Sequence, residues 1–114
     1  MERNCLFCKI VAGEIPGSFV YRDDEIVAIE DVNPQAPTHL LIIPIEHAVN
    51  LSRFVEAAPP ALVAKLFGVV ARLGSELGLE EYRAVVNTGP AGGQTVGHLH
   101  VHLLAGRKMH WPPG

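Results

Sequence analysis

The segment GHLHVHLLAG, residues 97–106, carries histidine at every second position, namely His98, His100 and His102. Successive side chains of a β-strand point to opposite faces, so a strand here would place the three imidazoles on one face, about 7 Å apart. An imidazole with a pKa of about 6.5 is largely neutral at pH 7, and it can then bind a metal or act as a nucleophile. The spacing therefore predicts a metal site, a catalytic strand or both, with an exposed surface strand as the plainer interpretation.

A second group of chemically active side chains lies at the start of the chain. Cys5 and Cys8 are spaced so that one helical turn brings both thiolates to the same ion. We predict a zinc site completed by His47 and His98, which would clip the N-terminal helix to the sheet. A redox pair is the alternative, but the strand that should precede such a motif is absent, and a zinc site made of the triad histidines themselves is another.

A zinc-bound imidazole nitrogen has lost the lone pair that makes it a nucleophile or base, so this assignment leaves His100 and His102 free. The preceding loop, TGPAGGQTV, lacks the lysine and spacing of a P-loop. Its adjacent glycines, Gly92 and Gly93, still allow the backbone to approach an anion closely. Gln94 and Thr95 add side-chain donors beside them, so we predict that His100 attacks phosphorus next to a phosphate cradle.

The composition limits the class of protein. With 114 residues we expect one domain, residues 1–114. Hydrophobic residues make up 48% of the chain, but no apolar run is long enough for a transmembrane helix, and the N-terminus does not have the pattern of a secretory signal. The net charge of −3 without a basic cluster argues against binding to long nucleic acids. Two cysteines are too few for a disulfide framework, so a reducing cytoplasm is the expected location.

Periodicity predicts an α+β fold. We expect a short opening helix that is capped by Asn4 and ends by Gly13 to Pro16, and strands on either side of a turn at Asp23–Asp24. A buried strand over 38–47 is halted by Pro44, and the last two strands fall in 82–89 and 98–106, where Leu99, Val101 and Leu103 face the core. The one long helix, within 59–80, carries an apolar stripe that would cover the sheet: Leu62, Leu66, Val69, Leu73 and Leu77.

Four blocks of the sequence resemble one known family. HLHVHLL fits the histidine-triad (HIT) pattern, and CLFCKIVAGEIP, DVNPQAPTHLLIIPIEH, GGQTVGHLHVHLL and GRKMHWPPG resemble, in this order, the Hint branch of histidine triad nucleotide-binding proteins. The resemblance implies a five-stranded antiparallel sheet with one long and one short helix, and a homodimer in which two sheets join into ten strands. The C-terminal segment with Trp111, the only tryptophan, would reach towards the partner's active site.

The resemblance also implies an activity, that of a purine nucleoside phosphoramidase acting on adenosine 5′-monophosphoramidate and similar substrates. His100 would be the nucleophile that forms a nucleotidyl-histidine intermediate, and His102 would contact the phosphate together with Thr95. Asn87 would bind near the phosphate and ribose, Asp31 would hold the ribose hydroxyls, and His39 would be a fourth imidazole on the leaving-group side. On sequence alone, His39 also fits a satisfied strand-edge histidine and Asp31 an ordinary turn residue.

Two other functions stay open at this point. One is a dinucleoside polyphosphate hydrolase of the same superfamily, and the other is a nucleotide-binding interaction module whose catalysis is incidental. His102 argues against the uridylyltransferase branch, in which the third histidine is glutamine. Some Hint members lack the second cysteine, whereas this chain has both, which favours zinc. Gly97 stands where relatives have bulkier residues, and this departure has two open consequences: a looser site, or changed contacts to the leaving group.

Overall fold

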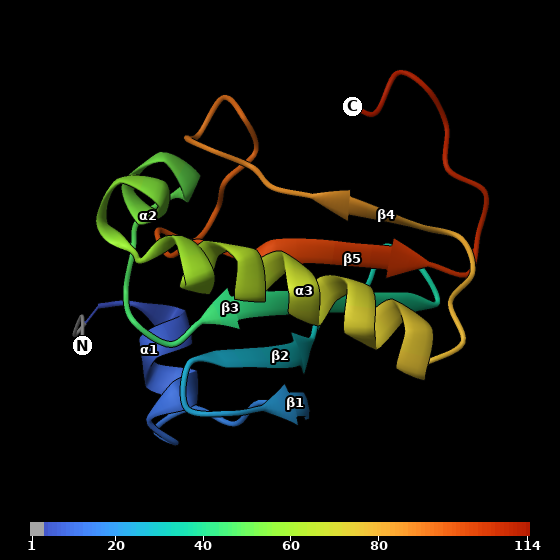
Figure 1. Ribbon diagram of the computed structural model, residues 1–114. Coiled ribbons are helices and arrows are strands. Elements are labelled where there is room, and N and C mark those ends of the chain that lie inside the picture. The colour runs from blue at the N-terminus through green and yellow to red at the C-terminus, as the bar shows by residue number, and fades with distance from the viewer. Residues whose placement is uncertain (1–3) are drawn as a thin grey trace.

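The computed structural model describes residues 4–114 and contains one five-stranded antiparallel sheet in the order β1-β2-β3-β5-β4 (Figure 1). The strands are β1 (Phe19–Arg22), β2 (Ile26–Glu30), β3 (Thr38–Pro44), β4 (Tyr82–Val85) and β5 (Val101–Ala105). Every neighbouring pair is antiparallel. The predicted α+β class and strand number are confirmed.

Three helices accompany the sheet: α1 (Leu6–Val11), α2 (Leu51–Ala57) and α3 (Pro60–Glu76). The prediction of one short and one long helix was wrong, because α2 was missed. Asn50 caps α2 by accepting a hydrogen bond from the Arg53 amide at 3.0 Å. The predicted N-cap of α1 was also wrong: Cys5 takes that position, and its Sγ accepts a hydrogen bond from the amide of Cys8.

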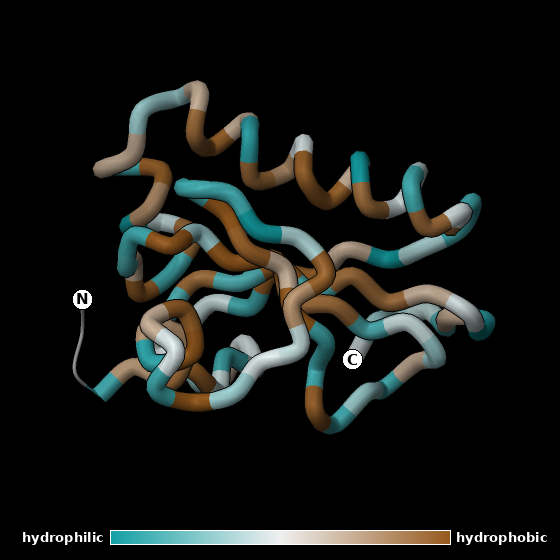
Figure 2. Tube along the Cα trace, turned by 90° about the horizontal axis from the view of Figure 1, so that it is seen from below, coloured by the Kyte–Doolittle hydropathy of each residue, from teal (hydrophilic) through white to brown (hydrophobic). Residues whose placement is uncertain are grey.

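Helix α3 covers one face of the sheet and forms the main core with it (Figure 2). Leu66, Val69 and Leu73 repeat at helical spacing and are all buried. Leu77, predicted to belong to the same stripe, is 49% exposed because the helix ends one residue before it. None of the helices in residues 4–114 combines the length and apolar character that crossing a bilayer requires.

The opposite face of the sheet carries α1 and the candidate chemistry. Strand alternation sends Leu40 and Ile42 of β3 into the α3 core, whereas Leu41 and Ile43 pack with α1. His39 therefore lies on the α1 side. The register pairs His102 of β5 with Leu41, so His102 shares that side of the sheet with His39.

The segment before β5 differs from the prediction. His98 and His100 precede the first strand residue, Val101, and do not continue a regular strand. The amide of Leu99 donates to the Ala48 carbonyl at 2.8 Å, outside the sheet ladder, and thereby ties this segment to the one after β3. The interpretation as an exposed histidine strand is excluded, because His98 and His100 are both buried.

The turn between β1 and β2 provides a pH-dependent element of stability. Burial raises the pKa of Asp23, but hydrogen bonds from the Tyr21 hydroxyl, the amides of Glu25 and Ile26, and Lys65 outweigh burial and hold this pKa well below its usual value. A lowered folded-state pKa stabilises the protein above the unfolded-state pKa of about 3.9, and this contribution is lost as the pH falls through the folded-state pKa.

We expect Asp23→Asn to lower the free energy of unfolding by about 1 kcal/mol at pH 7, the size of a partly exposed charged hydrogen-bond group. The difference from the wild type should shrink as the pH falls below about 4. Urea unfolding at pH 7 and pH 3 measures both values, with the exposed neighbour Asp24→Asn as the matched control. A difference that is independent of pH would contradict the assignment to the carboxylate charge.

Candidate active site

Four predicted metal ligands meet in one cluster beside α1. The ligand atoms of Cys5, Cys8, His47 and His98 all lie within 4.8 Å of one another. Nδ1 of His98 lies 3.2 Å from the Cys5 sulfur and 3.1 Å from Nδ1 of His47, which lies 3.5 Å from the Cys8 sulfur. Ligands around a tetrahedral zinc ion are separated by about 3.3 to 3.8 Å, so this donor set fits zinc closely.

The protonation state of His98 suits a metal ligand. Its Nε2–H donates to the Pro44 carbonyl at 2.7 Å, which leaves the lone pair on Nδ1, the atom inside the cluster. Burial lowers the pKa of His98 to about 4, so the ring is neutral at pH 7. Burial also raises the pKa of the Cys5 thiol, and a bound cation would offset this effect.

His100 presents the opposite nitrogen for chemistry. Its Nδ1–H donates to the backbone carbonyl of His98 at 2.8 Å, so the lone pair resides on Nε2. Burial lowers the pKa of His100, and the ring therefore stays neutral at pH 7. A neutral imidazole with one fixed, unprotonated nitrogen is a nucleophile that needs no separate base.

His39 and His102 form a directed hydrogen-bond relay beside His100. The backbone amide of Gln35 donates to Nδ1 of His39 at 3.0 Å, so the proton of the His39 ring is on Nε2. That Nε2–H donates to Nδ1 of His102 at 2.9 Å, and the remaining proton of His102 is consequently on its own Nε2. Burial, together with the imidazoles of His100 and His39, lowers the pKa of His102 to about 4.

Asp31, which follows β2 directly, completes this group. Its Oδ2 lies 3.4 Å from Nε2 of His39, and its Oδ1 accepts a hydrogen bond from the amide of Asn33. Asp31, His39 and His102 bring three donor atoms together as a metal site would. Metal binding at Nε2 of His39 would leave that ring without a proton, because the Gln35 amide occupies Nδ1. Of the two clusters in residues 4–114, only the cysteine-containing one fits a metal.

The glycine-rich loop is held by Gln94, which corrects one prediction. Its amide group donates to the carbonyls of Val49 (2.6 Å) and Val96 (3.0 Å), and its oxygen accepts from the amide of Gly89 (2.9 Å). Both donor hydrogens are thus used inside the protein, and Gln94 is not free to bind a phosphate as predicted. It positions the loop instead.

The other two loop residues are placed differently. Asn87 is half-buried, and its amide reaches the Gly93 carbonyl at 3.5 Å, a long contact that a ligand can replace. Thr95 is exposed and lines a hollow of about 510 Å³ together with Cys5 and His47. The loop therefore leaves the Thr95 hydroxyl accessible on the side of the cluster formed by Cys5, Cys8, His47 and His98.

A second hollow of about 510 Å³ lies beside Asp31 and was missed by sequence reasoning. Ile10, Ile29 and Val32 give it apolar walls around the carboxylate. The sequence does show aliphatic residues on either side of Asp31. Ile10, however, comes close to them only because α1 packs against β2 in the folded protein. Asp31 and His39 also line a separate hollow of about 420 Å³, together with Leu77 and Leu79, which follow α3.

Together, the sheet and the histidine group define an α+β protein with a triad-type site. The HIT domain model matches residues 12–109, and the chain belongs to the HIT domain family. It is 50% identical to an uncharacterized HIT-like protein of Synechococcus elongatus over the full length of both chains. It is 45% identical to a 14 kDa zinc-binding protein of Zea mays over 96% of this chain and 87% of that protein.

A solved structure supports the same assignment. The crystal structure of a HIT family hydrolase from Legionella pneumophila superposes with a TM-score of 0.92 at 49% identity. The match covers 97% of this chain and 100% of that chain. The HIT fold is thereby confirmed.

Proposed function

We propose that the protein is a hydrolase that cleaves the P–N bond of purine nucleoside 5′-phosphoramidates, such as adenosine 5′-monophosphoramidate. The observation that carries this proposal is the hydrogen bond from Nδ1 of His100 to the His98 carbonyl, which leaves an unprotonated Nε2 on a neutral buried ring. The Legionella hydrolase and the histidine-triad resemblance support the same reaction class.

The reaction has two steps. Nε2 of His100 attacks phosphorus, a new N–P bond forms, and the bond to the leaving amine breaks. The leaving nitrogen takes up a proton from water as it departs, because a neutral His102 that gave up its Nε2–H would become an anion. That Nε2–H instead donates a hydrogen bond to the phosphoryl oxygens, while Nδ1 accepts from His39. Water then attacks phosphorus of the nucleotidyl-His100, the bond between Nε2 and phosphorus breaks, and the water releases one proton. The products are the nucleoside monophosphate and free, neutral His100.

Recognition of the nucleoside is assigned to the hollow beside Asp31. A carboxylate accepts hydrogen bonds from a vicinal diol, and the apolar side chains Ile10, Ile29 and Val32 suit the faces of a purine. Asn87 and Thr95 remain the proposed phosphate donors of the glycine-rich loop. A nucleoside monophosphate would then extend from the hollow towards the histidine group.

Assays against three kinds of compound test the activity. Purified protein is expected to hydrolyse adenosine 5′-phosphoramidate faster than diadenosine polyphosphates, and to bind AMP as product. Faster cleavage of diadenosine polyphosphates would assign the protein to the polyphosphate hydrolases instead. Tight AMP binding without turnover of either compound would leave a nucleotide-binding interaction module.

For the metal centre, we propose a structural zinc ion held by Cys5, Cys8, His47 and His98. Zinc at this position would join α1 to the segments that follow β3 and precede β5, and it would keep the thiolates deprotonated. The related zinc-binding protein of Zea mays supports this assignment. Two free, buried cysteines also suit a reducing compartment, and we propose the cytoplasm.

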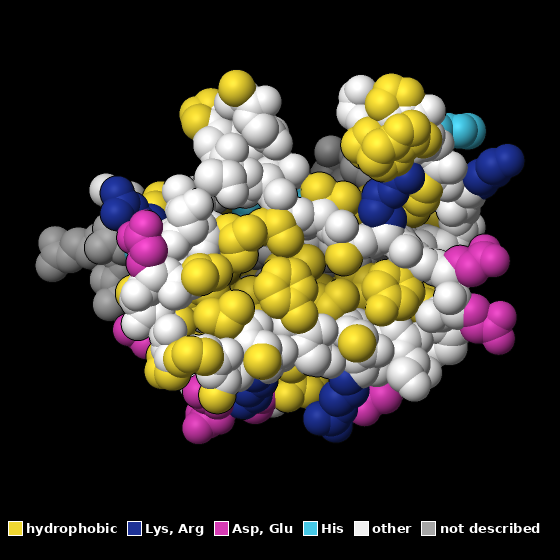
Figure 3. Space-filling model, turned by 45° about the horizontal axis from the view of Figure 1, so that its top comes forward, with side chains coloured by type: hydrophobic (Ala, Val, Ile, Leu, Met, Phe, Trp, Pro, Cys, Tyr) yellow, Lys and Arg dark blue, Asp and Glu magenta, His cyan; other side chains and the backbone are white. Residues whose placement is uncertain are grey.

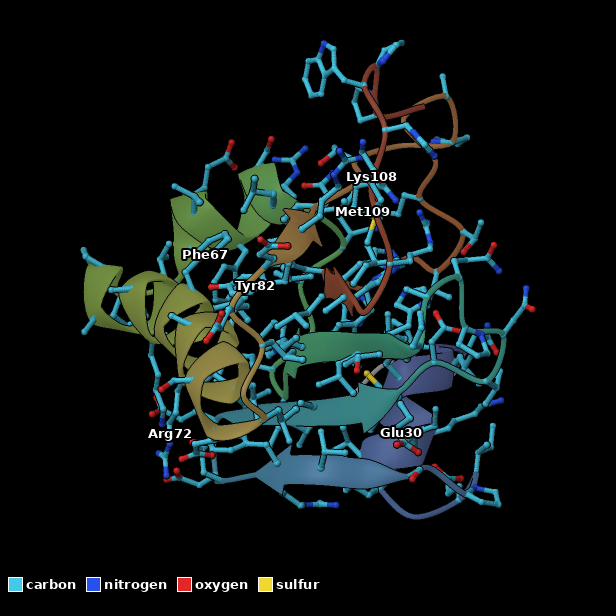
Figure 4. The ribbon with its side chains drawn as sticks, turned by 90° about the vertical axis from the view of Figure 1, so that its right-hand side faces the viewer. Glu30, Phe67, Arg72, Tyr82, Lys108 and Met109 are labelled. Atoms are coloured by element: carbon cyan, nitrogen blue, oxygen red, sulfur yellow. The ribbon has the colours of Figure 1, made fainter. Side chains whose placement is uncertain are left out.

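We also propose a homodimer formed through β4 and α3. Strand β4 lies at the edge of the sheet, where its outer backbone groups are free to pair with another strand. Phe67 of α3 and Tyr82 of β4 are 41% and 40% exposed, on the side of the molecule shown in Figure 4. Figure 3, in which the top of the Figure 1 view comes forward, shows hydrophobic side chains gathered over α3 and β4. Two copies joined at β4 would form one ten-stranded sheet.

Phe67→Glu is expected to convert this dimer into a monomer, because a carboxylate would be buried in an apolar interface. Light scattering coupled to size-exclusion chromatography measures the mass. The control is Val55→Glu, which changes an exposed apolar residue of α2, a different helix, and should leave the mass unchanged. A wild-type protein that elutes as a monomer, or an unaltered Phe67→Glu dimer, would refute this interface.

A further inference from the structure

One aromatic side chain links the metal cluster to the candidate nucleophile. Phe7 lies on α1 between Cys5 and Cys8, and it is 3% exposed. Its ring meets the ring of His100 edge-on, with centroids 4.9 Å apart and an interplanar angle of 76°. It also meets the ring of His98 at 5.9 Å and 78°.

From these contacts we propose that Phe7 is a positioning residue, which transmits the docking of α1 at the metal cluster to the imidazole of His100. The inference rests on the proposed function, in which His100 is the nucleophile. It adds a role for a residue that touches no reacting atom and that the proposed reaction does not otherwise use.

The length of α1 makes its position dependent on outside contacts. A helix of six residues has almost no stability of its own in water, so tertiary contacts must hold it. Those contacts are the buried side chains of Phe7 and Ile10 and the two sulfur atoms in the cluster. Zinc binding at the cluster would therefore hold α1 in place against the sheet, and with it the ring of Phe7.

The contacts of His100 show why this ring matters. The hydrogen bond from Nδ1 to the His98 carbonyl fixes one end of the imidazole, but rotation about that bond would still move Nε2. The rings of Phe7 and His102, each with its centroid 4.9 Å from that of His100, restrict this rotation. Removing one of the two rings would leave Nε2 less well aimed at phosphorus.

A second connection runs through the backbone. His98 contributes its ring to the cluster and its carbonyl oxygen to His100. The ring of Phe7 packs on both histidines, so a displacement of α1 disturbs the donor–acceptor pair and the neighbouring ring together. The metal cluster and the nucleophile are thus joined by side-chain packing and by one peptide carbonyl.

The test compares Phe7→Leu with Phe54→Leu in zinc-loaded protein. Phe54 is also 3% exposed but lies in the core on the α3 side, so both variants lose the same atoms from a buried site. For Phe7→Leu we expect kcat to fall about 10- to 100-fold while KM changes little, because misaligned reacting groups lose rate more than binding. Phe54→Leu should lower the melting temperature with kcat close to the wild-type value.

Nitrogen-15 NMR of the imidazole rings gives a readout that needs no substrate. Wild-type His100 should show one protonated and one unprotonated nitrogen, and Phe7→Leu should move these two resonances towards each other, as in a tautomer mixture. Chelation of zinc from the wild type should move the same resonances in the same direction. If chelation unfolds the protein, the two zinc-loaded variants decide the question.

The inference would be overturned if Phe7→Leu kept the His100 resonances and the kcat of the wild type. It would also be overturned if Phe54→Leu lowered kcat and shifted the His100 resonances as much as Phe7→Leu does. A third contrary result would be unchanged His100 resonances in folded, metal-free protein. A wild-type protein that turns over no nucleotide would refute the proposed function. The imidazole resonances would still show whether Phe7 orients His100, so the two failures are distinguishable.

Discussion

His100→Ala is expected to reduce turnover of adenosine 5′-phosphoramidate by about 10⁴-fold or more, with AMP binding retained. The expected loss is large because the variant has no atom that can form the nucleotidyl intermediate, and the catalytic groups of one site act as a unit. In the proposed complex, AMP is bound by the hollow beside Asp31 and by the glycine-rich loop, which the substitution leaves in place. Single-turnover kinetics and calorimetric AMP titration measure the two quantities separately.

A second variant controls for structural damage at this buried position. His100→Asn keeps a side-chain amide that can donate to the His98 carbonyl, as Nδ1 does now, but it lacks a nucleophilic nitrogen. It should unfold close to the wild-type temperature and be as inactive as His100→Ala. Substantial turnover in either variant would remove His100 from the role of nucleophile.

Cys8→Ser is expected to abolish zinc binding and to lower the free energy of unfolding by about 3 kcal/mol or more. For a domain of this size, that corresponds to a fall in melting temperature of roughly 10 °C or more. The sulfur of Cys8 is buried next to His47 and His98, and a hydroxyl group is a much weaker zinc ligand. Metal analysis of protein purified without chelator and thermal unfolding measure the two effects.

Chelation serves as the matched control for this prediction. A chelator should lower the melting temperature of the wild type towards that of Cys8→Ser, and it should leave the variant unchanged, because the variant has no zinc to lose. Wild-type protein that contains no zinc and whose Cys5 and Cys8 react freely with an alkylating reagent would contradict the assignment.

The sequence predicted which residues gather better than it predicted their local geometry. Cys5, Cys8, His47 and His98 come from three separate segments, yet donor chemistry alone was enough to group them. The alternation of histidine and apolar residues continues before the first residue of β5, and the sequence-based prediction therefore wrongly placed His98 and His100 in the strand. The His98 ring donates to the Pro44 carbonyl and the His100 ring to the His98 carbonyl, and these bonds take the segment out of the sheet ladder.

Other misses share a physical cause, which is competition between possible hydrogen-bond partners. Gln94 has donors that suit a phosphate, but three backbone groups of the fold use its amide first. Helix α2 was missed because its seven residues have a weak apolar pattern, and its Asn50 cap is a signal that many loops also contain. The role of Phe7 was hidden because ring packing between α1 and the segment before β5 depends on the completed fold.

The direction of the relay between His39 and His102 is set by a peptide group, the backbone N–H of Gln35. Almost any side chain at position 35 preserves that N–H, so evolutionary drift there leaves the ordering of protons in the neighbouring rings intact. Proline is the one natural residue that deletes it. The positions of the protons on His39 and His102 are therefore determined by the main chain, and a comparison of side-chain identities would not reveal them.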